Sequence, residues 1–411
     1  MKRPLRVGIF GARRGLYLGK LFDLHPQASV VALCEQDPQR RQEAKTSLPQ
    51  LEAAYSEYAS LLEHDIDVVV IANDATAHAP YAIQALEAGI HVFSEVLACK
   101  TLAEGVALAR AVERSQALYS FAENCCYMRP ALEMERIYQA GKVGEFIYGE
   151  AEYVHDCTGV WHRLTYGLPN HWRNWIGATV YCSHALGPIL TITKTRPTRC
   201  VGFTTPNLLG RQVGRRGDDM GLIVCQMDNG ALCKVLLATA CRREPPSHWY
   251  SIYGTRGHME NTRGPGEEEV HIYREDDQGS EYHRKYVPSF PTKLPWARSM
   301  GGHGGADAQM VADFVQAVLQ GGPPPIDVYT ALDMTLPGIL AFRSACEGNI
   351  PLEVPDLRHE EVRARYESDH WTSDPHADPS NRHSPSAHGE ISIPPEVYAE
   401  QRRKYLNTLE E

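Results

Sequence analysis

The 411-residue sequence contains no apolar run that approaches the length needed to cross a membrane. Its first residues, MKRPLRVGIF, lead directly into a strand-like segment and lack the apolar core of a signal peptide. None of the eleven cysteines forms a C-x-x-C pair, so we expect reduced thiols. These absences favour a cytoplasmic protein that has no membrane partner.

A basic stripe is also absent. The 41 Lys and Arg residues are outnumbered by 51 Asp and Glu, and the formal net charge of −10 argues against nucleic-acid binding. The histidines near the C-terminus lack the spacing of metal ligands, and nothing else in the sequence indicates a required metal. A compact neutral or weakly charged small molecule is the expected substrate.

The first third of the chain alternates short apolar segments with helical periods, and at this length two domains are expected. The apolar segments are LRVGIFGA, SVVALCE, DVVVIAN, HVFSE and LYSFAEN. Short buried strands separated by helices of this length are typical of a parallel sheet covered on both faces. We therefore predict an α/β fold whose residues 1–124 form a Rossmann-type, doubly wound dinucleotide-binding domain.

The pattern changes at about Cys125. GEFIYGEAEYVHD alternates like a half-exposed strand, and GLIVCQMDNGALCKVLLAT is typical of a hairpin that turns on 228–230. We predict a C-terminal α+β domain over 125–366 with an open, mainly antiparallel sheet. An exposed face of that sheet would bury well against a copy of itself, so a homodimer or homotetramer is expected. Residues 367–411 are predicted to form an extended, loosely packed arm.

The first glycine turn, GIFGARRG (8–15), lies between a strand and a helix start. Backbone N–H groups and a helix dipole at such a turn suit a pyrophosphate, although Arg13 breaks the regular G-x-G-x-x-G pattern. Glu35 ends the second strand, 20 residues after Gly15, where a carboxylate binds ribose hydroxyls and repels a 2′-phosphate. NAD is therefore the expected cofactor, bound in this region by Gly11, Ala12, Arg13, Arg14 and Glu35.

A candidate acid–base pair lies in ATVYCSHALGPI (178–189), where Tyr181 and His184 are three residues apart. If the segment begins a helix, both side chains lie on one face. An imidazole suits reversible proton transfer at neutral pH, whereas a phenol needs a cationic neighbour or hydrogen-bond donors to act as a base. The alternative is an ordinary helix start whose histidine is satisfied by the backbone.

The third to fifth βα units, DIDVVVIANDATAHAPYAIQALEAGIHVFSEV and TLAEGVALARAVERS, resemble the Gfo/Idh/MocA superfamily of NAD(P)-dependent oxidoreductases. Ordinary members carry Glu-Lys-Pro at a strand end, and an aspartate and a histidine four residues apart in the second domain. Here Glu95-Val96-Leu97 occupies the first motif, and Val180 stands four residues before His184. Only the histidine remains, which counts against a simple dehydrogenase.

A narrower resemblance, to glycoside hydrolase family 109, rests on seven motifs in the same order. They are AENCCY, GEAEYVHD, HWR, YCSHALGPI, GGHGGAD, PPIDVY and PLEVPDL. The resemblance implies a redox-neutral glycosidase in which hydride leaves C3 of the sugar and a base removes the C2 proton as the C1 group departs. Water then adds and the hydride returns. It also implies NAD contacts for Asn73, Ala75, Thr76, His78, Glu95, Val96 and Asn124.

The same resemblance implies that Tyr153, Arg173, Tyr181 and His184 face the sugar. We assign the C3 hydroxyl proton to His184 and interpret Tyr181 as the C2 base or the residue that organises it, although the two roles are interchangeable at this stage. Pro246 stands where the family has a substrate-contacting tyrosine, so a preference for N-acetylhexosamines does not carry over.

His303 lies in GGHGGAD (301–307), where flanking glycines let the backbone approach a ligand, so it is predicted to line the substrate pocket. The alternative is a loop that enters the last long helix, with Asp307 as its cap. Three functions remain open on the sequence: a redox-neutral glycosidase, a sugar or cyclitol dehydrogenase, and a non-catalytic dinucleotide-binding sensor. Only the irregular glycine turn supports the sensor.

Overall fold

The computed structural model describes residues 3–264, 268–277, 283–289 and 302–409. The chain forms two compact units, and each is described by itself. The first unit consists of Met1–Arg129, Phe290–Leu332 and Leu357–Asp369, and the second of Pro130–Ser289, Asp333–Asp356 and His370–Glu411. No helix among the described residues is both long and apolar enough to span a membrane.

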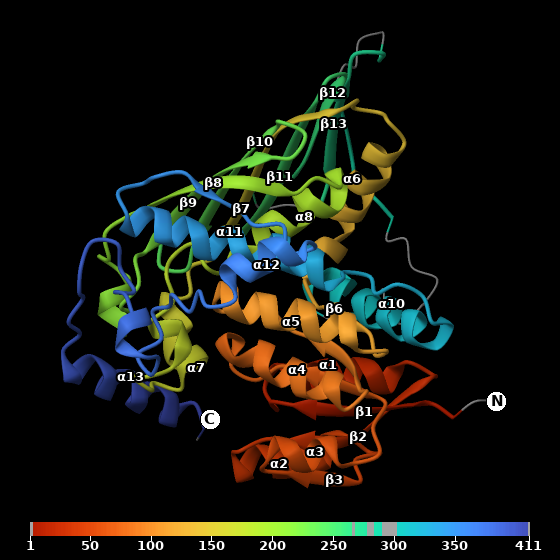
Figure 1. Ribbon diagram of the computed structural model, residues 1–411, viewed down its shortest axis with the longest axis vertical. Helices are drawn as coiled ribbons and strands as arrows, with labels where there is room; N and C mark the ends of the chain where they lie inside the picture. The colour runs from red at the N-terminus through yellow and green to blue at the C-terminus, as the bar shows by residue number, and fades with distance from the viewer. Residues whose placement is uncertain (1–2, 265–267, 278–282, 290–301, 410–411) are drawn as a thin grey trace. The chain divides into compact units, whose positions relative to one another are not determined.

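The first unit is built on a six-stranded parallel sheet with the order β3-β2-β1-β4-β5-β6 (Figure 1). This order winds outward from a central strand in both directions, which is the doubly wound topology expected from the sequence. β1 and β4 are rich in Val and Ile and are buried on both faces of the sheet. The strands are β1 (Leu5–Phe10), β2 (Ala28–Cys34), β3 (Ala53–Tyr55), β4 (Val68–Ile71), β5 (His91–Ser94) and β6 (Tyr119–Phe121).

Side-chain caps define two helix starts in this unit, because Asp37 and Thr101 accept hydrogen bonds from the second or third backbone N–H that follows. α4 packs against α5, and α1 against α10. β3 and α3 are absent from the sequence-based prediction, since elements of three and five residues show no readable period. The helices are α1 (Arg14–Leu24), α2 (Pro38–Ser47), α3 (Tyr58–Leu62), α4 (His78–Glu87), α5 (Leu102–Arg114), α10 (Ala306–Gln320) and α12 (Glu360–Tyr366).

A cluster of three phenylalanines ties α10 to the parallel sheet. Phe22 of α1, Phe93 of β5 and Phe314 of α10 are buried, with ring centroids 5.0 to 6.3 Å apart. This packing places 306–320 in the first unit, whereas the sequence boundaries assign it to the C-terminal domain. Helical periodicity shows that one face of a helix is buried but does not identify what it packs against. A domain boundary drawn along the sequence therefore does not show that 306–320 packs on the first unit.

The second unit contains a nine-stranded sheet with the order β14-β13-β12-β11-β7-β10-β9-β8-β15 (Figure 1). β7 and β10 pair in parallel, and the other described pairs are antiparallel, so the open, mainly antiparallel sheet is confirmed. Gly230 has φ +86° in the predicted β9–β10 turn. The strands are β7 (Phe146–Val154), β8 (Pro197–Thr204), β9 (Met220–Met227), β10 (Leu232–Ala238), β11 (Ser247–Gly254), β12 (Gly257–Asn261), β13 (Val270–Arg274), β14 (His283–Tyr286) and β15 (Leu352–Glu353).

One helix of this unit, α8, packs on β7 and β11 in the middle of the sheet. Its apolar residues are buried, as the period of HALGPILTIT requires. α11 is shared, because its first residues belong to the first unit and the rest to the second. The remaining helices are α6 (Arg129–Gln139), α7 (Trp161–Thr165), α8 (Ser183–Thr193), α11 (Val328–Cys346) and α13 (Pro395–Asn407).

Residues 370–409 of the predicted arm pack as part of the second unit and are not loose. The ring of Trp371 stacks on His383 with centroids 3.4 Å apart, and Arg343 of α11 lies 4.8 Å from the centre of the Trp371 ring. Tyr398 of α13 donates a hydrogen bond to the carbonyl of Gly214 (3.0 Å). The prediction of loose packing is wrong because this polar segment is held by stacked rings and backbone hydrogen bonds, which hydrophobic patterning does not register.

Candidate active site

The glycine turn after β1 requires glycine at position 11. Gly11 has φ +93°, and a Cβ there would lie 2.6 Å from the carbonyl oxygen of Ala72. The next residue, Ala12, donates its backbone N–H to Glu35 Oε2 (2.8 Å). Glu35 thus holds the turn from the end of β2 and places a negative charge beside it, as the preference for NAD requires. Arg13 is exposed and precedes α1.

Two amide oxygens at the carboxyl ends of the strands lack partners. The Oδ1 atoms of Asn73, after β4, and Asn124, after β6, are buried and have no hydrogen-bond partner in the described part of the chain. Buried acceptors are normally satisfied, and ligands of doubly wound sheets bind at this edge. Both asparagines are predicted cofactor contacts. The residues present therefore fit a bound dinucleotide that offers hydroxyl or amide donors.

The other cofactor residues predicted after β4 are buried and offer mainly backbone atoms. Ala75 and Thr76 form η1 (Ala75–Ala77). His78, which begins α4, has Nδ1 3.1 Å from the carbonyl of Leu97 and Nε2 3.3 Å from the carbonyl of Asn73. Burial lowers the pKa of His78, so the ring is neutral and its single N–H donates to one of these two carbonyls.

Glu95 and Val96 follow β5. Glu95 Oε1 accepts a hydrogen bond from Arg14 Nε (2.7 Å), and its Oε2 accepts one from the backbone N–H of Val96 (3.3 Å). The Val96 side chain is buried. The structure thus brings Arg14 of the glycine turn and Glu95 together as an ion pair.

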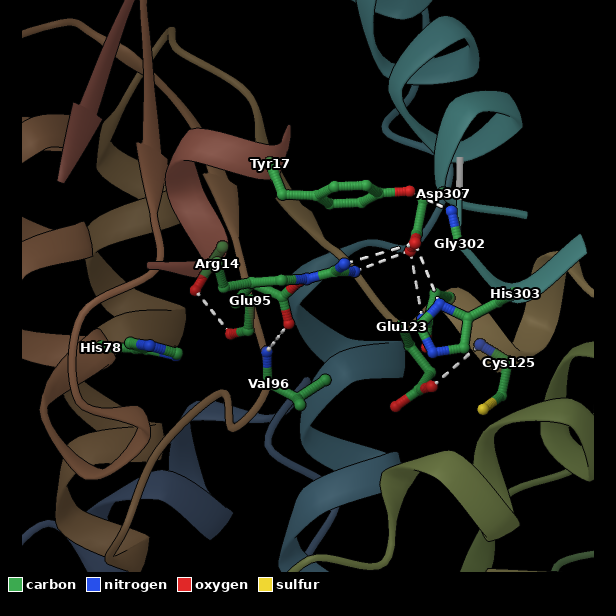
Figure 2. A network of polar contacts seen from close by, with 12 residues as sticks. Arg14, Tyr17, His78, Glu95, Val96, Glu123, Cys125, Gly302, His303 and Asp307 are labelled. Atoms are coloured by element: carbon green, nitrogen blue, oxygen red, sulfur yellow. Dashed lines mark hydrogen bonds and ion pairs between the residues drawn. The ribbon is translucent and has the colours of Figure 1, made fainter. Parts of the chain in front are cut away.

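Arg14 also donates hydrogen bonds to a second carboxylate, that of Asp307, as Figure 2 shows. Arg14 Nη2 lies 2.7 Å from Asp307 Oδ1, Asn124 Nδ2 lies 3.1 Å from the same oxygen, and His303 Nδ1 lies 2.9 Å from Oδ2. Burial raises the pKa of Asp307, but hydrogen bonds from His303 and Arg14 and the charge of Arg14 outweigh it and lower the pKa to about 2. Asp307 is therefore ionised at neutral pH.

Gly305 is the N-cap of α10 and Asp307 lies in the first turn of the helix, so the alternative that Asp307 caps α10 is wrong. His303 lies in η6 (His303–Gly305) with φ +57°, and 40% of its side chain remains exposed. The backbone N–H of the preceding Gly302 donates a hydrogen bond to the hydroxyl of Tyr17 on α1. The glycine-rich loop is thus held from two sides, at Tyr17 and at Asp307.

In the second unit, the predicted sugar-contacting residues come together. The ring of Tyr153, on β7, lies 4.8 Å from His184 and 6.2 Å from Tyr181, and the Tyr181 and His184 rings are 5.0 Å apart. Arg173 of η4 (Trp172–Asn174) places its guanidinium carbon 5.6 Å from the centre of the Tyr181 ring. α8 begins at Ser183, so His184 lies in its first turn but Tyr181 precedes the helix.

Two further histidines join this group. His248 of β11 pairs with Tyr153 across the β7–β11 ladder, and the two rings stack with centroids 5.2 Å apart. His155 lies 6.2 Å from Tyr153, and burial lowers the pKa of its imidazole. His248 is absent from the sequence-based prediction. His248 lies on one face of β11, but only the register with β7 brings it to Tyr153.

Buried groups behind these side chains hold their backbone. Arg215 donates from Nη1 to the carbonyl of Arg173 (2.9 Å) and from Nη2 to that of Ile176 (3.2 Å). Burial lowers the pKa of Arg215 to about 10, although two nearby aspartates oppose the shift. The Tyr250 hydroxyl donates to the carbonyl of His184 (2.8 Å). The site is therefore supported from two segments of the unit, the one that carries Arg215 and the strand β11.

Known proteins resemble this chain in both of its parts. Residues 5–123 match the model of the oxidoreductase family with an NAD-binding Rossmann fold, Gfo/Idh/MocA, and residues 214–363 match the C-terminal domain of glycosyl hydrolase 109. Glycosyl hydrolase family 109 protein 1 of Bacteroides thetaiotaomicron is 27% identical over 403 residues, which cover 86% of this chain and 84% of the relative. The family 109 protein of Porphyromonas gingivalis is 27% identical over 411 residues, with the same coverage.

Solved structures show the same fold. Levoglucosan dehydrogenase in complex with NADH and levoglucosan has a TM-score of 0.71 at 19% identity, and covers 86% of this chain and 100% of its own. Myo-inositol 2-dehydrogenase from Lactobacillus plantarum has a TM-score of 0.68 at 20% identity, with the same coverage. The resemblance indicated by the sequence motifs is therefore confirmed, and the cofactor is NAD.

Proposed function

We propose that this NAD-dependent enzyme, which joins a Gfo/Idh/MocA Rossmann domain to a glycosyl hydrolase 109 C-terminal domain, is a redox-neutral glycosidase acting on a small glycoside. The observation that carries the proposal is the meeting of Tyr181, His184 and Arg173 around Tyr153 in the second unit. Two proton-transferring side chains and one cation are what a combined oxidation and elimination requires.

The residues of the first unit would hold the cofactor. Gly11 and the start of α1 suit the pyrophosphate, and Glu35 suits the ribose hydroxyls. The unpartnered amide oxygens of Asn73 and Asn124 would accept hydrogen bonds from further donors of the cofactor. Bound NAD supplies a reversible hydride acceptor, which allows a carbinol carbon of the sugar to be oxidised and later restored. The net reaction consumes no NAD.

His184 and Tyr181 would transfer the protons. His184 takes the C3 hydroxyl proton as that carbon becomes a ketone and returns it at the end, which suits an imidazole. The ketone acidifies the C2 proton, which Tyr181 removes while the C1–oxygen bond breaks. Water then adds at C1, and the proton returns to C2. Arg173, 5.6 Å from the Tyr181 ring, supplies the positive charge that stabilises a phenolate.

Val96 makes the glycosidase a better proposal than a net dehydrogenase. The resemblance places the proton-transferring lysine of ordinary dehydrogenases at this position, and a buried valine transfers no proton. The family 109 name of the two bacterial relatives also supports a glycosidase. A sugar or cyclitol dehydrogenase is the second candidate, because levoglucosan and myo-inositol are the compounds named for the dehydrogenases that share the fold.

We also propose that the protein acts in the cytoplasm as a homo-oligomer. The exposed face of the nine-stranded sheet supports the self-association. The strand registers place the exposed Phe203, Leu232 and Tyr253 on one face, across β8, β10 and β11. A homodimer or homotetramer would bury them. Light scattering after gel filtration tests this, with Leu232→Glu expected to yield monomers; a monomeric wild type would contradict it.

The test of the function is a panel of nitrophenyl glycosides, with both anomers of several sugars, followed in D₂O with absorbance recorded in the NADH band. We expect aryl release without lasting NADH, and deuterium at C2 of the released sugar, since elimination exchanges that proton with solvent. Tyr181→Phe should abolish release. The matched control is Tyr398→Phe, which removes the same atom from the arm and should leave activity unchanged.

Each alternative outcome would contradict a different part of the proposal. Aryl release without deuterium at C2 would rule out the elimination step. Steady NADH formation from free sugars, without aryl release, would favour the dehydrogenase. If the purified protein binds no NADH, the sensor and both enzyme proposals fail together.

A further inference from the structure

The carboxylate of Asp307 joins three segments that are far apart in the sequence. Its partners are Arg14 at the start of α1 and His303 in η6, both labelled in Figure 2, and Asn124 in η2 (Asn124–Tyr127); all lie within the first unit. The Asp307 side chain is 0% exposed, whereas 40% of the His303 side chain is exposed. A buried anion therefore holds one edge of an imidazole that a reactant can still reach.

The hydrogen bonds around His303 determine its tautomer. Nδ1 lies 2.9 Å from Asp307 Oδ2 and also 2.9 Å from Asn124 Nδ2. A ring nitrogen either donates or accepts, so only one of these contacts is a full hydrogen bond. The ionised carboxylate can only accept, and charge-assisted bonds are about twice as strong as neutral ones. Asn124 Nδ2 has a second acceptor in Asp307 Oδ1 (3.1 Å).

Nδ1–H of His303 therefore donates to Asp307, which leaves the lone pair of the neutral ring on Nε2. Asp307 stays ionised because Arg14 and His303 lower its pKa against the effect of burial. Arg14 in turn is shared with Glu95. Arg14 thus holds two carboxylates, one of which orients the histidine.

We propose that Asp307 is a positioning residue that fixes His303 as the Nδ1–H tautomer, and that His303 Nε2 accepts the proton of a carbohydrate hydroxyl. The first half stands on the contacts within the first unit alone, whereas the second half rests on the proposed function. His303, predicted from the sequence to line the pocket, is then a second imidazole base in addition to His184. Asp307 acts on the reaction only by orienting His303, and Arg14 and Asn124 act only by holding Asp307.

The first experiment measures the tautomer and needs no substrate. Full-length protein with NAD, labelled with ¹⁵N-histidine, is examined by long-range proton–nitrogen NMR above the pH at which the ring titrates, and His303→Gln assigns the signal. We expect protonated Nδ1 and unprotonated Nε2. Asp307→Asn should move the population toward Nε2–H, and the control Asp313→Asn, on the same helix, should not. A wild-type ring protonated on Nε2 would overturn the first half, even if Asp307→Asn does not fold.

The second experiment separates hydrogen bonding from proton transfer. In His303→Gln the side-chain amide offers an acceptor near the position of Nε2 but takes up no proton. We expect kcat to fall about 100-fold, within the range of acid–base catalysis, while KM changes less than about threefold. An unchanged kcat would overturn the second half. NADH affinity, measured by fluorescence, should be unchanged in His303→Gln.

These readouts keep the two proposals distinguishable. If no glycoside is cleaved by the wild type, the proposed function fails while the tautomer still decides the role of Asp307. If cleavage occurs and the tautomer is Nε2–H, the proposed function stands and the positioning role fails.

Discussion

Replacing Gly11 with alanine tests whether the cofactor turn requires glycine because its backbone lies so close to the backbone that follows β4. Gly11 has φ +93°, which L-residues with a side chain rarely adopt. A Cβ there would lie 2.6 Å from the carbonyl oxygen of Ala72 and 2.7 Å from the backbone nitrogen of Asn73. Both atoms belong to backbone at the end of β4, so no side-chain rotation relieves the overlap.

The expected cost has two parts. An unfavourable backbone conformation costs about 1–3 kcal/mol, and an added methyl group in a packed region costs about 1–3 kcal/mol more. Gly11→Ala should therefore destabilise the protein by about 2–6 kcal/mol. The matched control is Gly89→Ala, because Gly89 has φ +74° and a Cβ there meets nothing within 4 Å. Only the conformational cost applies to the control, and the effect of alanine on the unfolded chain cancels between the variants.

Urea unfolding of both variants gives the difference, and fluorescence titration with NADH gives the functional consequence. We expect Gly11→Ala to be less stable than Gly89→Ala by at least about 1 kcal/mol. It should also bind NADH more weakly, because the overlap moves Asn73. Equal stabilities together with equal NADH affinities would refute the argument that this turn depends on a close backbone approach.

Three further predictions concern charge and packing. The pKa of Asp307 is lowered from 3.8 to about 2, so its ionised form stabilises the folded state by about 2 kcal/mol above about pH 4, and this contribution is lost as pH falls toward 2. The difference in unfolding free energy between wild type and Asp307→Asn should therefore shrink as pH falls from about 4 to about 2. A constant difference would contradict this. Arg215→Met removes a buried cation that holds the carbonyl of Arg173. The free energy of unfolding in urea should fall by about 3 kcal/mol, and glycoside cleavage should become slower. Unchanged cleavage would mean that the Arg173 loop does not need this hydrogen bond. Trp371→Ala removes the stack on His383 and should cost about 2 kcal/mol, with faster proteolysis in the arm; equal proteolysis would show that other contacts hold it.

Local patterns in the sequence predict most of the fold and the glycine turn of the cofactor domain. Val/Ile-rich segments with helical periods between them determine a parallel sheet, because no other arrangement covers such strands on both faces. Asp228-Asn229-Gly230 determines the β9–β10 hairpin because glycine adopts the positive φ that the turn needs. Glu35 is also predictable, since a fixed strand and helix length brings the end of β2 beside the first turn.

The tertiary structure alone decided which distant residues meet. Asp307 has the sequence context of a helix cap, yet it is an ion-pair partner of Arg14, 293 residues away. His248 reaches Tyr153 only through the register of β11 on β7, since a shift of one residue would turn its ring to the other face.

The physical reason is the separation along the chain of the residues that interact. Periodicity, turn chemistry and capping reflect interactions within about a turn or two of one residue, and these can be read along the chain. Ion pairs, stacked rings and unpartnered buried acceptors depend on which segments the folded chain brings together. The sequence by itself therefore determined a Rossmann domain with an NAD turn and a second domain with an open sheet. Only the folded chain decided that Asp307 orients His303, because that contact joins residues of α1, η2, η6 and α10 that no local pattern connects.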